Sequence, residues 1–242
     1  MPEGHLQDLI DIQNDVRLAF QWDYADDVES ASQMDLAFDN EAPFGITDWS
    51  FQGRCDTLKE ICQILISAKK VVIIGAAAQE EMLEKINQDN VSIIAADGSV
   101  GALKDFENLV CIISDLDGGD YIDLAAKKGQ RFIIHAHGDN HQRWMDIIAK
   151  WSDFAMPPKL VLSHQTNEEF PGMENFGGFT DGDRALCFAI WAGVKVENIE
   201  LLGFSTKKIG RWSGVTNREK KLKKLLWMEK IVSMFNLNNQ ID

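Results

Sequence analysis

The segment LVCIISDLDGGD, residues 109–120, carries the strongest fold signal in the chain, because a nearly continuous apolar run is followed at once by acids and glycines. An apolar run without polar alternation indicates a strand that is buried on both faces, as in a parallel sheet between helices. Five further runs of this kind lie at residues 71–75, 91–96, 131–136, 159–164 and 198–204. We therefore predict an α/β fold: a three-layer, Rossmann-like, mostly parallel sheet with helices on both faces.

The first 68 residues have a different pattern. Apolar residues recur at helical spacing over residues 6–20 and 57–70, whereas residues 38–53 are rich in turn formers and aromatic side chains. We predict a mainly helical N-terminal segment over residues 1–68, followed by an α/β domain over residues 69–242. A chain of 242 residues is long enough for this arrangement.

The composition is typical of a folded globular protein, with 45% hydrophobic and 26% charged residues. No apolar run approaches the ~20 residues that a membrane-spanning helix needs, and the N-terminus carries acids where a signal peptide has basic residues. Four cysteines without paired spacing argue against a disulfide framework. We predict a cytoplasmic protein in which Cys111 and Cys187 are buried, reduced thiols.

The net charge of −14 argues against nonspecific binding to nucleic acid, because nucleic-acid phosphates are held by clustered Lys and Arg. Basic residues gather between residues 207 and 230, and we expect most of them on the solvated face of a C-terminal helix. Lys207 and Lys208 precede that helix and follow a strand, so they are the better ligand candidates. The predicted partners are small molecules, without nucleic acid or membrane, and a homo-oligomer stays open.

Small or acidic residues follow almost every predicted strand. Ligands bind beyond the carboxyl ends of the strands in an open parallel sheet, so these residues are expected to converge on one cleft. Carboxylates gathered in a cleft repel one another, and a divalent cation relieves that repulsion. The strand ends concerned are Gly75, Asp97–Gly98, Asp115–Gly118, His135–Asn140 and Gly203–Ser205.

The acids Asp115 and Asp117 lie two positions apart in SDLDGGD. In an extended segment both carboxylates point to the same side and can share one Mg²⁺. The alternative is a helix N-cap by Asp117 with the two glycines as turn residues. The acids at the neighbouring strand ends favour metal or phosphate binding.

The segment HAHGDNH, residues 135–141, resembles the ligand pattern of a zinc hydrolase at first sight. A two-zinc set cannot be completed, because Asn140 takes a ligand position and only His164 remains downstream. One zinc held by His135, His137 and a carboxylate stays open. The better focus is Gly138-Asp139-Asn140, a predicted tight turn that presents a carboxylate and an amide to the cleft, with the two histidines beside it.

The segment NFGGFTDGDRA, residues 175–185, follows an irregular stretch over residues 163–179, which suggests a lid or a binding loop. Thr180 or Asp181 is expected to cap the next helix, with Asp183 in its first turn. Arg184 stands beside these acids, where it can clamp a phosphate.

The segment VVIIGAAAQEE, residues 71–81, has the order strand, glycine, helix, as in a phosphate-binding loop. It lacks the glycine pattern of a dinucleotide site and the lysine of a Walker loop. We predict a helix N-terminus after Gly75, whose backbone N–H groups can hold an anion.

Four motifs occur in a family-specific order: AADGS, SDLDGGD, HAHGDN and NFGGFTDGDRA. In this respect residues 65–235 resemble the archaeal 6-hydroxymethyl-7,8-dihydropterin pyrophosphokinases and, more distantly, proteins of the thiamine pyrophosphokinase fold. The resemblance implies Mg²⁺-dependent transfer of diphosphate from ATP to the hydroxymethyl group of the pterin. It also implies AMP as the second product and a place in folate or methanopterin-type cofactor biosynthesis.

The resemblance also implies roles for individual residues. Asp115, Asp117 and Asp139 would be catalytic and, together with Asp181, would hold Mg²⁺ and the triphosphate. The candidates for binding ATP or the pterin are Gly75, Asp97, Asn140, Asp183, Arg184, Lys207 and Lys208. One departure is the loop GAAAQ at residues 75–79, where the family has a glycine-rich loop containing Pro or Ser.

Three alternatives remain at this point. The chain can be a diphosphokinase for another heterocyclic alcohol such as thiamine, a nucleotide- or pterin-binding protein without catalysis, or a metal-dependent hydrolase. Trp22, Trp49, Phe176 and Trp212 are candidates for stacking on a pterin, although each also suits core packing.

Overall fold

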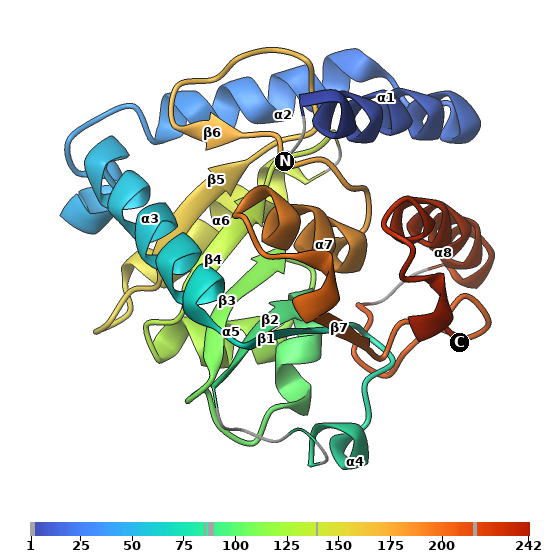
Figure 1. Ribbon diagram of the computed structural model, residues 1–242. Coiled ribbons are helices and arrows are strands. Elements are labelled where there is room, and N and C mark those ends of the chain that lie inside the picture. Colours follow the sequence, from blue (N-terminus) through green and yellow to red (C-terminus); the bar gives the residue numbers. More distant parts are fainter. Residues whose placement is uncertain (1–2, 85, 87–89, 139, 215–216) are drawn as a thin grey trace.

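The computed structural model describes residues 3–84, 86, 90–138, 140–214 and 217–242 (Figure 1). Within these residues, seven strands form one sheet in the order β6-β5-β4-β3-β2-β1-β7, and every neighbouring pair is parallel. The strands are β1 (Lys70–Ile74), β2 (Val91–Ala96), β3 (Leu109–Ser114), β4 (Arg131–His135), β5 (Lys159–Ser163), β6 (Met173–Glu174) and β7 (Ile199–Leu202). Six of them match the predicted runs. The two-residue strand β6 was not predicted, because it contains no apolar run.

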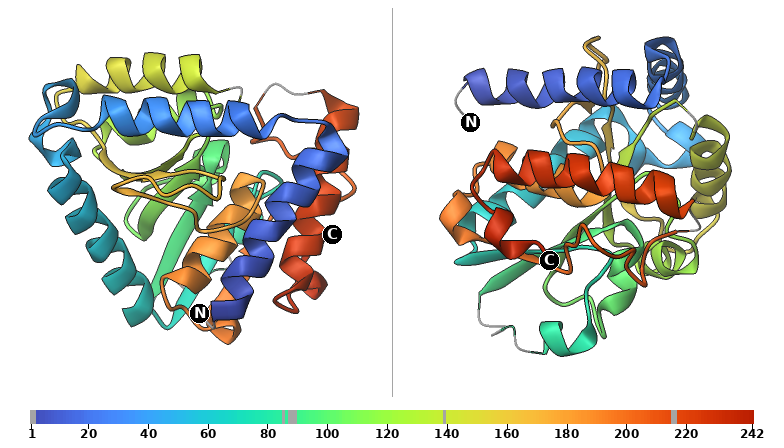
Figure 2. Two further views of the ribbon diagram at one scale, coloured as in Figure 1. Left: turned by 90° about the horizontal axis from the view of Figure 1, so that it is seen from above. Right: turned by 90° about the vertical axis from the view of Figure 1, so that its right-hand side faces the viewer.

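Helices cover both faces of the sheet, which confirms the predicted three-layer fold (Figures 1 and 2). Val71 and Ile73 of β1 pack toward the first layer, and Val72 and Ile74 pack toward the second. The first layer contains α1 (Glu3–Phe20), α3 (Phe51–Ser67), α7 (Asp181–Trp191) and α8 (Arg218–Ser233). The second contains α2 (Tyr24–Ala37), α4 (Glu80–Leu83), α5 (Asp120–Lys127) and α6 (His141–Ser152). Short 3₁₀ helices are η1 (Pro43–Gly45), η2 (Thr47–Trp49), η3 (Asp97–Ala102), η4 (Val196–Asn198) and η5 (Asn238–Gln240).

The N-terminal segment contributes to both layers. Leu9 and Val16 of α1 belong to the first core cluster, whereas Ala31 and Met34 of α2 belong to the second. The corner between α1 and α2 therefore passes from one face of the sheet to the other. The division of the chain into two parts after residue 68 stays a prediction.

The connections change sides beside β1. The chain leaves β1 toward α4 in the second layer, whereas it enters the neighbouring strand β7 from α7 in the first layer. Such a switch point between adjacent parallel strands is where α/β proteins bind ligands.

The prediction of a helix directly after Gly75 is wrong. The helix α4 begins at Glu80 and has four residues. The backbone before it is engaged by the segment after β7, since Ala77 N donates to Gly203 O (2.9 Å) and Trp212 N donates to Ala76 O (3.1 Å). The backbone of Ala76 and Ala77 thus pairs with the segment after β7, so the Ala77 amide is engaged inside the protein.

The glycines expected in the loop after β1 stand opposite it instead. A Cβ on Gly210 would lie 2.0 Å from Ala76 O, and one on Gly203 would lie 2.1 Å from Ala78 N. The two backbones touch, so side chains are excluded at residues 203 and 210. The sequence GAAAQ is therefore compatible with a tight loop.

The remaining general predictions concern cysteines and membranes. All four cysteines are free, and Cys111 and Cys187 are buried, as predicted. No helix in the described part of the chain is both long and apolar enough to span a membrane. The cytoplasmic location and the oligomeric state stay predictions.

Candidate active site

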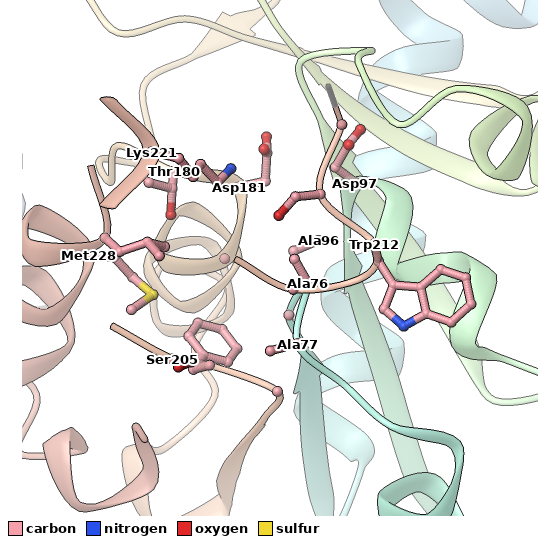
Figure 3. Close-up of a pocket in the computed structure, with 18 of the residues that line it drawn as sticks. Ala76, Ala77, Ala96, Asp97, Thr180, Asp181, Ser205, Trp212, Lys221 and Met228 are labelled. Atoms are coloured by element: carbon pink, nitrogen blue, oxygen red, sulfur yellow. The ribbon is translucent and has the colours of Figure 1, made fainter. Parts of the chain in front are cut away.

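Carboxylates gather at the carboxyl ends of the central strands. Asp97 follows β2, Asp115 and Asp117 follow β3, and Asp181 begins α7. Carboxylate oxygens of Asp97, Asp115 and Asp117 lie within 4.8 Å of one another, a grouping that can hold a metal ion. Sequence reasoning placed Asp115 and Asp117 together as metal ligands but assigned Asp97 to substrate binding. Figure 3 shows Asp97 and Asp181 reaching one cavity from different elements.

The backbone that carries these acids is in an unusual conformation. Asp97 has φ 48° and Leu116 has φ 68°, in the left-handed region that non-glycine residues rarely adopt. The buried Leu116 donates its N–H to Ser114 Oγ (2.8 Å), which holds the turn. Asp115 and Asp117 therefore meet through a turn and not through the extended segment that we expected. Such strained residues concentrate at functional sites.

The electrostatics of the cluster favour protonated carboxyls. Burial raises the pKa of Asp181 to about 7, and the charges of Asp115 and Asp117 add to this rise. Burial and neighbouring carboxylates also raise the pKa values of Asp97 and Asp117. A divalent cation would reverse these shifts, because it favours the ionised form of each carboxyl.

Asp115 is the exception in this cluster. Its Oδ2 lies 3.1 Å from His137 Nε2 and 4.0 Å from Arg143 Nη1. Although burial raises its pKa, the hydrogen bond and charge of His137 and the charge of Arg143 lower it to well below the usual value. Asp115 is thus the acid that stays ionised without a metal.

Two cavities meet at the carboxylate cluster. The first, of about 60 Å³, occupies the switch point beside β1, and the second, of about 140 Å³, lies under the corner between α1 and α2. Both cavities are lined by Asp117, Thr180, Asp181, Gly214 and Lys221. A group bound in one cavity can therefore reach a group bound in the other at the acids.

The first cavity has walls of small residues and backbone (Figure 3). Gly75, Ala76 and Ala96 follow or end the central strands, and Asp97 lies at the cavity wall. The predicted Lys208 lines this cavity, whereas Lys207 is exposed and lies outside its lining. Small walls let a ligand approach the backbone closely.

The second cavity has walls of buried polar side chains. Gln165 Oε1 accepts a hydrogen bond from Arg184 Nη2 (3.1 Å), and its Nε2 donates to both oxygens of Asp27 (2.9 Å each). His135 lies 3.1 Å from Ser163 Oγ through Nδ1 and 3.4 Å from Gln165 Oε1 through Nε2. Burial and the charge of Arg184 lower the pKa of His135, which keeps its ring neutral. These groups present fixed hydrogen-bonding positions.

Two histidines of HAHGDNH, His135 and His137, have hydrogen-bonding partners, whereas the buried Nε2 of His141 has none among the described residues. Both ring nitrogens of His135 face Ser163 and Gln165, and His137 faces Asp115. The metal-competent group found among the described residues consists of carboxylates. An oxygen-only donor set suits Mg²⁺ better than zinc.

Besides Lys207, three predicted site residues are placed outside the cavities or are not described. Asn140 is fully buried and ties its own loop, since Nδ2 donates to His135 O (2.6 Å) and Oδ1 accepts from His137 N (3.0 Å). Asp183 is also buried and accepts a hydrogen bond from the N–H of Thr180, the N-cap of α7. Neither lines either cavity. Asp139 lies outside the described residues.

Sequence reasoning missed Lys221 and Lys224, which it placed on a solvated helix face. Lys221 lines both cavities and Lys224 lines the second. Burial lowers the pKa of Lys224, and its Nζ lies 5.2 Å from the Trp22 ring centroid and 5.5 Å from that of Phe179. The signal was present, because these lysines share a helical stripe with the buried Leu225.

The chain has relatives with a common description. Residues 53–206 match the family described as "6-hydroxymethylpterin diphosphokinase MptE-like". A protein of Pyrococcus furiosus is 35% identical over 184 residues, covering 72% of this chain and 75% of the relative. One of Methanocaldococcus jannaschii is 32% identical over 189 residues, covering 72% and 69%. Both carry the name "6-hydroxymethyl-7,8-dihydropterin pyrophosphokinase".

Proposed function

Because the chain belongs to the MptE-like 6-hydroxymethylpterin diphosphokinase family, we propose that it is a diphosphotransferase that acts on 6-hydroxymethyl-7,8-dihydropterin. The co-substrate is a nucleotide, and ATP with Mg²⁺ is the form we propose. The hydroxymethyl oxygen attacks the β-phosphorus and loses its proton. The bond from that phosphorus to the oxygen shared with the α-phosphate breaks, and AMP leaves. The product serves folate or methanopterin-type cofactor biosynthesis.

The observation that carries this proposal is the carboxylate cluster where the two cavities meet. Asp97, Asp115 and Asp117 offer oxygen atoms within 4.8 Å of one another, and burial together with the neighbouring carboxylates raises the pKa values of Asp97 and Asp117. Mg²⁺ prefers oxygen ligands of this kind, so the residues fit the ion. When bound, Mg²⁺ supplies charge neutralisation at the triphosphate.

We assign the nucleotide to the first cavity. It occupies the switch point of the sheet, and its walls of Ala76, Ala77 and Ala96 allow close approach to backbone groups. Lys208 and Lys221 line the same cavity and neutralise phosphate oxygens.

We assign the pterin to the second cavity. A heterocycle with several hydrogen-bonding groups needs fixed polar partners and apolar walls. His135, Gln165 and Arg184 supply the former, and Trp22 and Phe179 supply the latter.

The protein contributes positioning and electrostatics to this reaction. Diphosphate transfer needs alignment of the reacting oxygen and phosphorus and neutralisation of charge, without a covalent nucleophile. Lys221 and Lys224 offer cations where the cavities adjoin. One carboxylate of the cluster accepts the hydroxyl proton.

The test is product analysis by chromatography after incubation with ATP, Mg²⁺ and the dihydropterin. AMP and the pterin diphosphate are expected in equal amounts. AMP formation with thiamine but not with the pterin would reject the acceptor. Nucleotide binding without AMP would indicate a binding protein, and stoichiometric, tightly held zinc would indicate a hydrolase.

A further inference from the structure

The corner between α1 and α2 forms one wall of the second cavity. Trp22, Asp23, Asp26 and Asp27 line it, together with residues from the strand ends. These four residues lie outside the region 53–206 that matches the family. The acids at the strand ends, Asp97, Asp115 and Asp117, thus come from the shared region, and this wall comes from a segment before it.

A buried network fixes the position of this corner. Asp27 accepts hydrogen bonds from Arg17 Nη1 (2.9 Å), Gln165 Nε2 (2.9 Å) and Gly138 N (2.8 Å). Arg17 Nη1 also donates to Gln165 O (2.9 Å). The side chains of Arg17 and Asp27 are 5% and 6% exposed, so removing either charge would leave the other buried without its counter-charge. The network ties α1 and α2 to the loops after β4 and β5.

Asp26 is placed differently from Asp27. It packs on the loop after β4, because a Cβ on Gly138 would lie 2.9 Å from Asp26 Cβ. Its side chain is exposed, lines the cavity and has no hydrogen-bond donor among the residues that the structure describes. The carboxylate of Asp27 is saturated by the network, whereas that of Asp26 is available to a ligand.

We propose that Asp26 determines acceptor specificity by accepting hydrogen bonds from adjacent N–H groups of the acceptor heterocycle. A reduced pterin offers such a pair in its 2-amino group and the neighbouring ring N–H, which a carboxylate can engage with both oxygens. Asp27 is the positioning residue that holds the corner over the cavity. This inference rests on the proposed function.

The test compares Asp26→Asn with Glu29→Gln, a matched change on the same helix at an exposed acid that accepts from Gln33. Asparagine at position 26 keeps one acceptor and replaces the other with a donor, so the pair to the heterocycle is lost. We expect the pterin KM of Asp26→Asn to rise by about tenfold or more, with the ATP KM within about twofold of wild type. Glu29→Gln should change neither value.

A second measurement keeps the two proposals apart. Calorimetric titration of each protein with the dihydropterin alone should show weaker binding by Asp26→Asn only. Normal pterin KM and affinity in that variant, with an active wild type, would overturn the role of Asp26 and leave the proposed function intact. Asp26-dependent binding without AMP formation would reject the proposed function alone, and a wild type that does not bind the pterin would reject both.

The positioning role of Asp27 has its own readout. Asp27→Asn should lower the midpoint of thermal unfolding and raise the pterin KM together, because it weakens the network. Asp26→Asn should raise the KM without changing the midpoint. An unchanged pterin KM in a folded Asp27→Asn protein would contradict the positioning role.

Discussion

Two charged clusters lie at opposite ends of the parallel strands. One lies at the amino ends of the strands, here called the amino edge, and the other lies at their carboxyl ends, here called the carboxyl edge. At the amino edge, Glu60 of α3 accepts from Arg131 and from Lys159 Nζ (2.9 Å), the first residues of β4 and β5. The hydrogen bonds of these two cations lower the pKa of Glu60 to about 2. One carboxylate between two cations is a complete structural ion cluster.

At the carboxyl edge, Arg184, Lys221 and Lys224 line the cavities, but burial and the neighbouring carboxylates still raise the pKa values of most of the gathered carboxyls. His137 and Arg143 both approach Asp115, while the pKa values of Asp97, Asp117 and Asp181 are raised. Asp97, Asp117 and Asp181 thus shift in the direction opposite to Glu60, whereas Asp115, beside His137, shifts in the same direction as Glu60. An edge at which burial and neighbouring carboxylates raise the pKa values of several carboxyls is suited to receive a cation, whereas the paired edge serves the fold.

The largest expected difference between the two edges is in turnover. Asp115→Asn should lower kcat by about 1,000-fold, because it removes a negative charge from the proposed Mg²⁺ site. Glu60→Gln should leave kcat unchanged. Steady-state rates of AMP formation measure both, and near-normal activity of a folded Asp115→Asn protein would contradict the metal role.

The cations beside the acids give the next effect. Lys224→Met should lower kcat by roughly 100-fold, because Lys224 lines the second cavity next to the acids. Lys223 is the matched control, since it is exposed on the same helix and pairs with Glu219. Equal activities of the Lys224→Met and Lys223→Met proteins would show that the buried lysine only packs.

Stability should respond to pH and Mg²⁺ at the carboxyl edge. The pKa of Asp181 rises from 3.8 to about 7 on folding, so the folded protein holds a proton that the unfolded chain has released. The metal-free protein should therefore lose stability as the pH rises through about 7. Mg²⁺ should raise the midpoint of thermal unfolding at about pH 8 and hardly at about pH 5.

A calorimetric scan at the two pH values checks this, and Asp181→Asn should reduce the Mg²⁺ effect. An equal gain from Mg²⁺ at both values would refute binding by the titrating carboxyls. The pH dependence of stability that comes from Glu60 has the opposite sign. Its contribution to the stability of the folded protein is present above about pH 4.5 and is lost as the pH falls through about 2.

The smallest expected effect is at the amino edge itself. The Glu60 side chain is 38% exposed, and such ion pairs contribute about 0–1 kcal/mol to the free energy of unfolding. Glu60→Gln should lower the unfolding midpoint by a few degrees at most. A large loss in thermal scans would mean that the amino-edge cluster is a main support of the fold.

The sequence predicted the sheet and the strand-end acids well, for a physical reason. Buried parallel strands are continuous apolar runs, and the residues after them must lie at one edge, so Asp97, Asp115 and Asp117 were placed at one cleft. The place of Lys221 and Lys224 in the cavity walls was not predicted, because they belong to a run of lysines that was expected on a solvated helix face.

Of the other features that were not predicted, two depend on contacts between distant residues and one on a rare backbone conformation. Asp27 and Gln165 are separated by 138 positions, so their hydrogen bond leaves no local signal. The left-handed turn at Leu116 was unforeseen because leucine rarely adopts it. The close contact of Gly210 with Ala76 likewise joins segments that a local glycine motif cannot reveal.

The most direct test of the cation site is the rate of AMP formation from ATP and the dihydropterin during a titration with Mg²⁺. The wild type and Glu60→Gln proteins should be inactive without Mg²⁺ and should reach the same plateau, while Asp117→Asn should stay near zero. A wild-type rate that survives chelation of Mg²⁺, or an Asp117→Asn curve equal to wild type, would contradict the account.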